Sequence, residues 1–305
     1  MTSYNQDGRV GPWAAEKLEF LGKYLSAYTT ILRKQEWCDG YLYIDAFAGA
    51  GRTEVRASEN GSVRAEDLLF DVSEFGRDDD EAQTYIDGSP YVALGIEHQF
   101  SRYYFVEKNP ERVSRLNDIK TEFSSTRNIN VVSGDAIQAI SKIVSNSGYD
   151  WRSHRAVIFL DPFGMQVPWN IIEKIAETRA IEIILNFPVG MAIQRLLPRS
   201  GVFTAEQRER LNRYFGLVEW EEVIYQRSID LFGATDVQKV QNSGNRLVSW
   251  YRDRLKLLFG FSSLPRLVRN SRGSHLYYLL FAGPNENGAK IASEVLRQGE
   301  VVRAN

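Results

Sequence analysis

Residues 41–51 read Tyr-Leu-Tyr-Ile-Asp-Ala-Phe-Ala-Gly-Ala-Gly, and this stretch decides the predicted fold. It begins with an aromatic and aliphatic run of the kind that forms a buried central strand. Asp45 ends the run, and a turn of small residues at 48–51 follows. Because glycine has no Cβ atom, this backbone can bend sharply and lie close to a ligand. A strand, a carboxylate and a Gly-x-Gly turn begin the ligand crevice of a doubly wound sheet, although a strand-to-helix turn without a ligand can have the same sequence.

Composition narrows the class of protein. The chain has 305 residues, 43% of them hydrophobic, which suits one large α/β domain or two smaller ones. The net charge of -2 gives no overall basic field, so any contact with nucleic acid must come from a local patch. Cys38 is the single cysteine, which excludes an intramolecular disulfide and a zinc or iron–sulfur cluster held by this chain. We expect no metal site.

The beginning of the chain lacks the basic and then apolar order of a signal peptide. No apolar run approaches the ~20 residues of a membrane span. We therefore expect a cytoplasmic protein with no membrane partner.

Further strand patterns alternate with helical patterns after residue 90. The strands are expected at 102–106, 130–132, 156–160 and 181–185, and the helices at 13–37, 91–100, 110–123, 136–144, 169–177 and 288–296. The helix at 13–37 is amphipathic and is interpreted as a packing helix, and Ser89 is expected to cap the helix at 91–100. This alternation predicts a parallel sheet with helices on both faces. Two later strands, 264–268 and 275–281, are expected to form an antiparallel hairpin at the sheet edge.

The predicted fold is α/β, with a Rossmann-like doubly wound sheet that is mostly parallel and has an antiparallel edge hairpin. We expect a single domain over 1–305, with an amino-terminal helix in 1–40 and a helical insertion at 199–260 in the carboxy-terminal third. The long polar stretch 52–87 leaves the glycine turn directly, and we interpret it as a loop that acts as a lid.

Four acidic residues follow the predicted parallel strands, namely Asp45, Glu107, Asp135 and Asp161. Right-handed crossovers place the carboxyl ends of such strands on one edge of the sheet. A single strand-end acid is commonly a turn former or a helix cap. Four of them along one edge favour a ligand site.

Two cofactor classes use this geometry. A nicotinamide dinucleotide requires Gly-x-Gly-x-x-Gly, but Glu54 stands at the third glycine position. S-adenosylmethionine requires a close-packed turn for its methionine part, an acid after the second strand for the ribose hydroxyls and a polar residue after the third for the adenine. These places are filled by Gly49, Gly51, Glu107, Asp135 and Ala136. An ionised carboxylate suits the ribose because it can accept two hydroxyl bonds.

Asp161-Pro162-Phe163-Gly164 is expected opposite the methyl group. Methyl transfer is an in-line displacement, so the protein must hold the nucleophile close and exclude water. Asp161 and the carbonyl of Pro162 can each accept a hydrogen from an amino group, and Phe163 can stack on a planar ring. The alternative is a solvated turn at a strand end.

In this order, Asp-Ala-Phe-Ala-Gly-Ala-Gly, Phe-Val-Glu-Lys-Asn, Gly-Asp-Ala and Phe-Leu-Asp-Pro-Phe-Gly resemble class I S-adenosylmethionine-dependent methyltransferases. More narrowly, the chain resembles the three-Cys-motif partner protein (TcmP) family. The match also includes Lys17, Tyr24, 88–90, Trp169, 186–188 and 277–281. That family is named for a neighbouring protein that carries a three-cysteine motif and resembles radical enzymes. The resemblance therefore implies a three-Cys-motif protein as partner.

The resemblance also implies site residues. Those expected to bind S-adenosylmethionine are Asp45, Ala46, Phe47, Gly49, Gly51, Glu107, Lys108, Asp135 and Ala136, and those expected to face the acceptor are Asp161, Pro162 and Phe163.

The turn at 161–164 is similar to the Asp/Asn-Pro-Pro-Tyr/Phe signature of enzymes that methylate amino nitrogens of bases, but Phe163 and Gly164 replace its last two residues. We therefore expect a nucleic-acid amino group as the substrate. Arginines able to contact phosphates, or simply solvated on helices, are Arg195, Arg199, Arg208, Arg210, Arg213, Arg246, Arg252 and Arg254. The alternatives are an accessory protein without turnover and a small-molecule methyltransferase.

Overall fold

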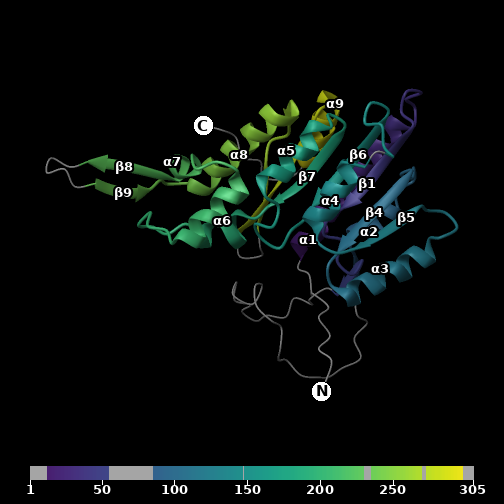
Figure 1. Cartoon of the computed structure of the whole chain (residues 1–305), viewed down its shortest axis with the longest axis horizontal. Helices are drawn as coiled ribbons and strands as arrows, with labels where there is room; N and C mark the ends of the chain where they lie inside the picture. Colours follow the sequence, from purple (N-terminus) through teal and green to yellow (C-terminus); the bar gives the residue numbers. More distant parts are fainter. Residues whose placement is uncertain (1–11, 55–84, 147, 230–234, 270–272, 298–305) are drawn as a thin grey trace, which may run out of the picture.

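The computed structural model describes residues 12–54, 85–146, 148–229, 235–269 and 273–297. A central sheet has the strand order β10-β12-β7-β6-β1-β4-β5, and β11 also pairs with β12 (Figure 1). Its parallel strands are β1 (Gly40–Asp45), β4 (Arg102–Glu107), β5 (Ile129–Ser133), β6 (His154–Leu160) and β7 (Ile181–Phe187).

The edge beyond β7 is antiparallel. β12 (His275–Gly283) runs against β7, and both β10 (Phe261–Ser262) and β11 (Arg266–Arg269) run against β12. The β5-β4-β1-β6-β7 part has the order of a doubly wound sheet, whose crevice opens where the order reverses between β1 and β6. The expected Rossmann-like fold with an antiparallel edge hairpin is therefore confirmed.

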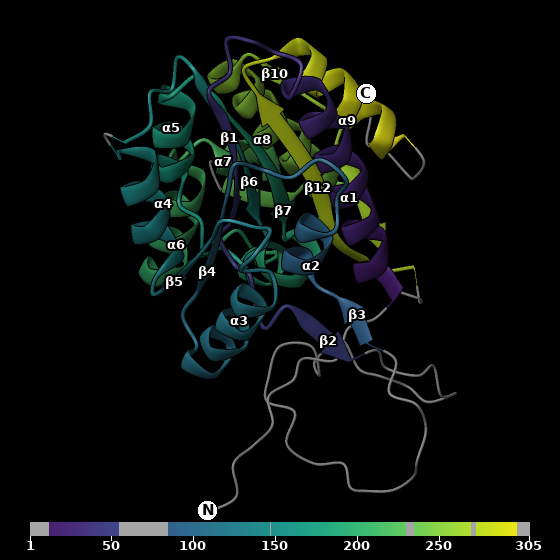
Figure 2. The same cartoon turned by 90° about the vertical axis from the view of Figure 1, so that its right-hand side faces the viewer.

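Helices cover both faces of the sheet (Figures 1 and 2). One face packs against α1 (Pro12–Leu32), α2 (Ser89–Leu94), α3 (Pro110–Glu122) and α9 (Glu286–Leu296). The other packs against α4 (Ala136–Val144), α5 (Trp169–Glu177), α6 (Ala205–Phe215), α7 (Trp220–Ile224) and α8 (Ser243–Phe259). Within the described ranges, none of the helices combines the length and apolar character that a membrane span requires.

Side-chain alternation explains these two layers. In β1, Tyr43 packs in the core beneath α1, whereas Leu42 and Ile44 pack in the core beneath α4 and α5. β6 and β7 have neighbours on both faces, and their sequences are almost continuously apolar for this reason.

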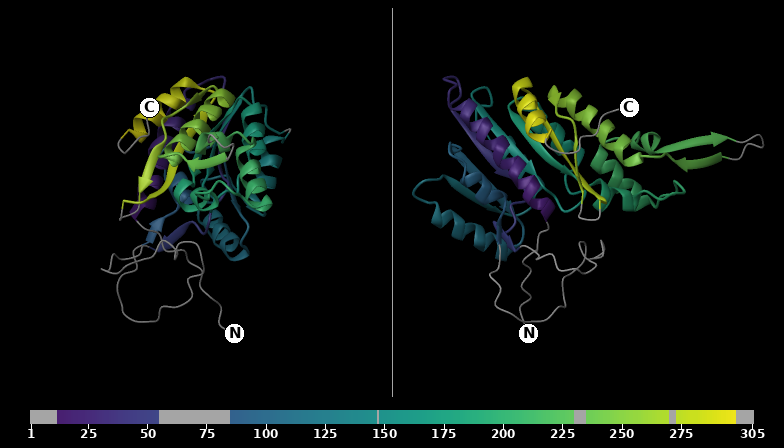
Figure 3. Two further views of the ribbon diagram at one scale, coloured as in Figure 1. Left: turned by 90° about the vertical axis from the view of Figure 1, so that its left-hand side faces the viewer. Right: turned by 180° about the vertical axis from the view of Figure 1, so that it is seen from behind.

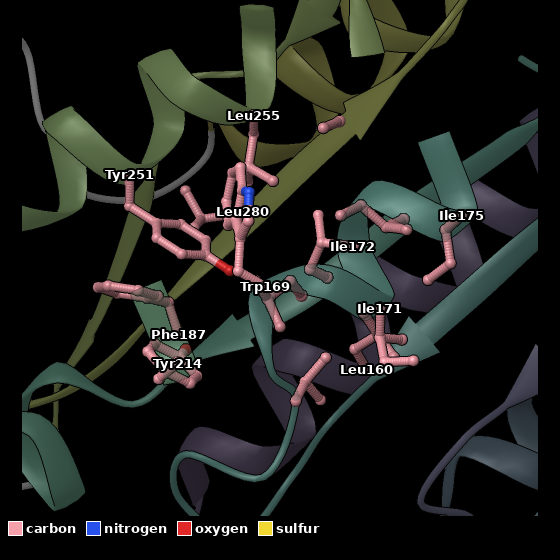
Figure 4. Packing of buried hydrophobic residues seen from close by; sticks show 14 of the residues in the cluster. Leu160, Trp169, Ile171, Ile172, Ile175, Phe187, Tyr214, Tyr251, Leu255 and Leu280 are labelled. Atoms are coloured by element: carbon pink, nitrogen blue, oxygen red, sulfur yellow. The ribbon is translucent and has the colours of Figure 1, made fainter. Parts of the chain in front are cut away.

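An aromatic cluster fixes the carboxyl end of β7 (Figure 4). The ring of Phe187 lies 4.6 Å from that of Tyr251, which stacks on Tyr214 at 5.9 Å. Trp169 meets Tyr251 edge-on at 5.3 Å, and the guanidinium of Arg254 lies 3.7 Å above the Trp169 ring. The cluster joins β7 to α5, α6 and α8, so the chain direction after Phe187 is set by packing.

A π-helix, η2 (Val189–Ile193), and a short 3-10 helix, η3 (Gln194–Leu196), follow β7. Gly190 packs directly on the start of β12, where a Cβ atom would lie 1.8 Å from the carbonyl oxygen of His275. Glycine is therefore required at this contact between η2 and the antiparallel edge.

The structure also corrects several expectations. α1 ends at Leu32 rather than at residue 37, and α2 ends at Leu94 rather than at residue 100. Residues 199–260 contain α6, α7 and α8, but also a hairpin of β8 (Tyr225–Ile229) and β9 (Thr235–Lys239), which projects from the body (Figures 1 and 3). These strands are short and largely polar, so the sequence carried little strand signal.

The stretch 52–87 begins and ends as strands rather than as loop. β2 (Arg52–Glu54) pairs antiparallel with β3 (Tyr85–Asp87). Residues 55–84 lie outside the described part of the chain, and the lid remains a prediction.

A carboxyl group is buried in the core beneath α1. Glu182 of β7 is 5% exposed, and its Oε2 accepts a hydrogen bond of 2.5 Å from the hydroxyl of Tyr24. Burial raises the pKa of Glu182 from 4.5 to about 7, although the Tyr24 bond and the charge of Arg155 act in the opposite direction. The folded state thus retains a proton that the unfolded chain loses between about pH 4.5 and pH 7.

We predict that Glu182→Gln removes the pH dependence of protein stability that the Glu182 carboxyl group causes. Ionisation of Glu182 costs the folded protein stability as the pH rises from about 4.5 to about 7. The variant should therefore unfold with a free energy about 2 kcal/mol higher than the wild type at pH 8 and with a similar value at pH 4.5. Urea denaturation at both pH values measures the difference. The exposed Glu177→Gln is the control, and an equal effect of Glu182→Gln at both pH values would contradict the assignment.

Candidate functional site

The carboxyl ends of β1, β4, β5, β6 and β7 meet at the sheet edge from which β2 and β3 extend (Figure 2). The sequence-predicted residues divide between the two sides of this edge. One group lines an open cavity beside α4 and α6, and the other forms a buried polar corner beneath α1.

The cavity has a volume of about 800 Å³. Seven of the expected residues line it, namely Ala46, Phe47, Glu107, Lys108, Asp135, Ala136 and Phe163. They come from the ends of four parallel strands that are far apart in the sequence. The volume lies within the range of roughly 300–1,000 Å³ that is typical of ligand pockets.

Glu107 ends β4 with a side chain that is 11% exposed. Its Oε1 accepts hydrogen bonds of 2.8 Å from the backbone N–H groups of Lys108 and Asn109. Its Oε2 lies 3.9 Å from Nη1 of Arg112. The turn therefore fixes one oxygen, and the second is the atom that a ligand in the cavity can use.

Asp135 is the N-cap of α4. Its Oδ1 accepts from the N–H groups of Ile137 at 3.0 Å and Gln138 at 3.1 Å. Asp135 therefore caps α4 and also lines the cavity. Because both bonds use Oδ1, Oδ2 remains as the acceptor for a ligand.

The glycine turn has a structural role. Gly49 and Gly51 have φ values of 64° and 85°, which favour glycine, but neither lines the cavity. A Cβ atom on Gly51 would lie 2.2 Å from Cδ1 of Ile119 in α3. The N–H of Ala48 also donates to the carbonyl of Val106 at 3.0 Å, so the turn is held against β4 and α3.

Asp45 belongs to the buried corner. It is fully buried, and it accepts hydrogen bonds from the backbone N–H of Phe47 and the hydroxyl of Tyr43, both at 3.3 Å. Burial raises its pKa to about 7, the hydroxyl of Ser89 opposes this shift by hydrogen bonding, and the charge of Asp161 adds to it. Ser89 was expected to cap α2, but the N-cap is Gly88 and the Ser89 side chain bonds Asp45 instead.

Asp161 is held between two partners. Its Oδ2 forms an ion pair with Nζ of Lys17 in α1, and its Oδ1 accepts a hydrogen bond of 2.7 Å from Nδ2 of Asn186 in β7. The Asp161 side chain is 23% exposed, whereas that of Lys17 is 13% exposed. The Lys17 ammonium also lies 5.5 Å from the centre of the Tyr277 ring. This cation offsets the repulsion between Asp161 and Asp45.

The turn after Asp161 connects the corner to the cavity. Pro162 is buried, and its carbonyl accepts a hydrogen bond of 3.0 Å from the N–H of Gly164. Phe163 is 78% exposed and lines the cavity. An aromatic face that is open to solvent is available to stack on a planar ligand.

Basic side chains also line the cavity, among them Arg195 of η3 and Arg210 and Arg213 of α6. Three other arginines named from the sequence have structural partners. Arg208 pairs with Glu221, Arg252 with Asp253, and Arg254 lies on Trp169. The list of arginines that face the cavity is thus shorter than the sequence suggested.

Sequence reasoning did not assign roles to Lys17 or Asn186. Lys17 lies in an amphipathic helix, where a packing role was the simpler interpretation, and only the family resemblance drew attention to both residues. Their contacts with Asp161 span 144 and 25 positions of the chain, which no local pattern reveals.

No group of three or more His, Cys, Asp or Glu side chains in the described ranges is arranged to hold a metal ion. The site therefore consists of a cavity lined by acidic and basic side chains and an adjoining acidic corner that contains one lysine.

The fold is Rossmann-like. No known family model matches the chain, and no curated protein matches its sequence. Protein LPL1258 from Legionella pneumophila, described with the family DUF519, has a similar structure with a TM-score of 0.49, 13% identity, and coverage of 94% of this chain and 92% of that one.

Two other solved structures are more distant. A conserved hypothetical protein from Streptococcus pyogenes has a TM-score of 0.30, 14% identity and coverage of 68% and 91%. The protein yhhF from Escherichia coli, proposed to be a methyltransferase, has a TM-score of 0.32, 10% identity and coverage of 86% and 87%. Similarities this distant assign no function to the chain.

We predict that Lys17→Met destabilises the protein in a pH-dependent way. Without the ammonium group, Asp161 and Asp45 face each other as two carboxylates above about pH 7, whereas Asp45 is protonated at lower pH. The free energy of unfolding should fall by about 2 kcal/mol at pH 8 and by less than half of that at pH 5.

Thermal and urea denaturation at the two pH values test this prediction. Lys23→Met is the matched control on the same helix, because Lys23 pairs with Glu19 at the surface and its loss should change stability by less than about 0.5 kcal/mol. A pH-independent loss in Lys17→Met would mean that the lysine stem, rather than its charge, stabilises the corner.

Proposed function

We propose that this chain is an S-adenosylmethionine-dependent methyltransferase that acts on an amino nitrogen of a nucleic-acid base. One observation carries the proposal. A single cavity brings together Phe47, Glu107, Asp135 and Phe163, each following a different parallel strand.

The residues of the cavity fit the cofactor. Oε2 of Glu107 is placed to accept from ribose hydroxyls, and Oδ2 of Asp135 with the first residues of α4 can bind the adenine amino group. Phe47, Ala46 and Ala136 supply apolar surface. Asp45 acts indirectly, because its buried carboxyl group accepts from the N–H of Phe47 and so holds the turn that carries Phe47 into the cavity.

When bound, the cofactor supplies a methyl group on a positively charged sulfur. The amino nitrogen of the acceptor would take that methyl group in exchange for one proton, which would pass to solvent, and the thioether would be the leaving group. Asp161 orients the amino group, Pro162 stiffens the turn, and Phe163 stacks on the base. The turn departs from the amino-methylating signature at Phe163 and Gly164, so stacking is assigned to the exposed Phe163 ring.

The basic side chains of the cavity support an anionic substrate. Arg195, Arg210 and Arg213 are among the residues that line it. Arginine side chains bind phosphate oxygens well because the guanidinium presents a planar fork of N–H donors.

We further propose membership of the TcmP family, with a three-Cys-motif protein as partner and a cytoplasmic location. One feature favours the alternative of an accessory protein without turnover. Both oxygens of Asp161 already have partners in Lys17 and Asn186, so an acceptor must share them. Activity without any polymer would instead indicate a small-molecule methyltransferase.

We predict that Glu107→Gln weakens the binding of S-adenosylmethionine by 10- to 100-fold, because a charged acceptor of ribose hydroxyls contributes about 1.5–3 kcal/mol. Calorimetric titration measures the affinity. Glu111→Gln is the control, since Glu111 lies in the first turn of α3 but does not line the cavity. Failure of the folded wild type to bind would favour the accessory protein.

We also predict that Arg210→Gln with Arg213→Gln weakens binding of single-stranded RNA and flattens its salt dependence. Loss of two phosphate contacts should reduce the slope of log affinity against log salt by about 1.4. Fluorescence anisotropy at several salt concentrations measures this slope. Lys120→Gln with Lys142→Gln removes the same charge at the last turns of α3 and α4. Equal slopes in the two double variants would contradict phosphate contact in the cavity.

A further inference from the structure

Asn186 has a side chain that the proposed reaction leaves unexplained. The residue lies at the carboxyl end of β7 and is 7% exposed. Its amide oxygen, Oδ1, is buried and accepts no hydrogen bond from the described residues. A buried acceptor without a partner lowers stability, and native structures contain few of them.

The orientation of the amide is determined by its neighbour. Nδ2 donates to Oδ1 of Asp161 at 2.7 Å. Turning the amide over would place its oxygen against a carboxylate oxygen, and two acceptors repel each other. Asp161 therefore holds Asn186 with Oδ1 directed away from itself.

The other acceptors at this point are already engaged. Asp161 receives bonds from Lys17 and Asn186, and the Pro162 carbonyl receives one from Gly164. Oδ1 of Asn186 is thus a buried acceptor beside Asp161 that has no partner among the described residues.

A carbonyl oxygen next to a carboxylate attracts an N–H donor and repels anions. We propose that Oδ1 of Asn186 accepts a hydrogen bond from the amino group that receives the methyl. Asp161 holds the Asn186 amide in the orientation that this contact requires. This inference rests on the proposed function and adds Asn186 as a residue that contacts the substrate.

Three variants test the role. Asn186→Ala removes the acceptor. Asn186→Asp retains an oxygen acceptor, but it can donate to Asp161 only when one of the two carboxyl groups is protonated. Asn130→Ala is the control, because Asn130 also has a buried atom without a partner, a donor on β5 at the other side of the sheet.

The probe is mixed-sequence single-stranded RNA and DNA, with transfer of labelled methyl from S-adenosylmethionine measured from pH 6 to pH 9. We expect kcat of Asn186→Ala to fall at least tenfold while its affinity for S-adenosylmethionine stays within threefold of the wild type. Asn186→Asp should lose activity as the pH rises, since both carboxyl groups then ionise. The melting temperature of Asn186→Ala should stay within about 2 °C of the wild type, which corresponds to about 1 kcal/mol for a chain of this length.

The outcomes separate this inference from the function on which it rests. Wild-type turnover in Asn186→Ala would overturn the contact alone, whereas a methyl group found on a carbon atom would overturn both the contact and the amino-nitrogen acceptor of the proposed function. Joint loss of cofactor binding and transfer would also overturn it, because Asn186 would then act on the cofactor or the fold. No transfer by a wild-type protein that binds S-adenosylmethionine would overturn both proposals.

Discussion

Parallel pairing of five strands is the constraint on which the rest of the structure depends. Every strand must be followed by a return path along one face of the sheet, so all five carboxyl ends reach the same edge. Polar residues placed there by distant parts of the sequence then meet without any local signal for their contact. Asp161 and Lys17 are the clearest pair, because a helix from the beginning of the chain supplies the cation for a strand end near its middle.

The same edge separates two electrostatic environments. Asp45 and Asp161 lie in a corner with little water, where burial makes charge costly and one lysine offsets the cost. Glu107 and Asp135 line an open cavity, where the carboxylates also organise the turns that carry them. The turns at 45–47 and 161–163 cross from one side to the other, so residues of the corner and residues that line the cavity are neighbours in the chain.

The fold was predictable because strand and helix periods are local. The bounds predicted for 136–144 and 169–177 agree with α4 and α5, and the antiparallel edge followed from two adjacent strand patterns. Prediction failed where tertiary contacts decide. The β8–β9 hairpin has too few apolar residues to show a period, and Ser89 bonds a residue 44 positions away rather than its own helix. The strand-end acids could be named from the sequence, but their division between cavity and corner depends on side-chain direction at the ends of β1 and β6.

The lining of the cavity comes from separate segments of the chain. Strand ends before residue 165 supply Glu107 and Asp135, whereas α6, in the segment between β7 and β12, supplies Arg210 and Arg213. Packing of Phe187 and Gly190 anchors that segment to the sheet. Substitutions or insertions within this segment can therefore accumulate without disturbing the strand ends. The residues that the segment contributes to the cavity can change during evolution while those at the strand ends are retained.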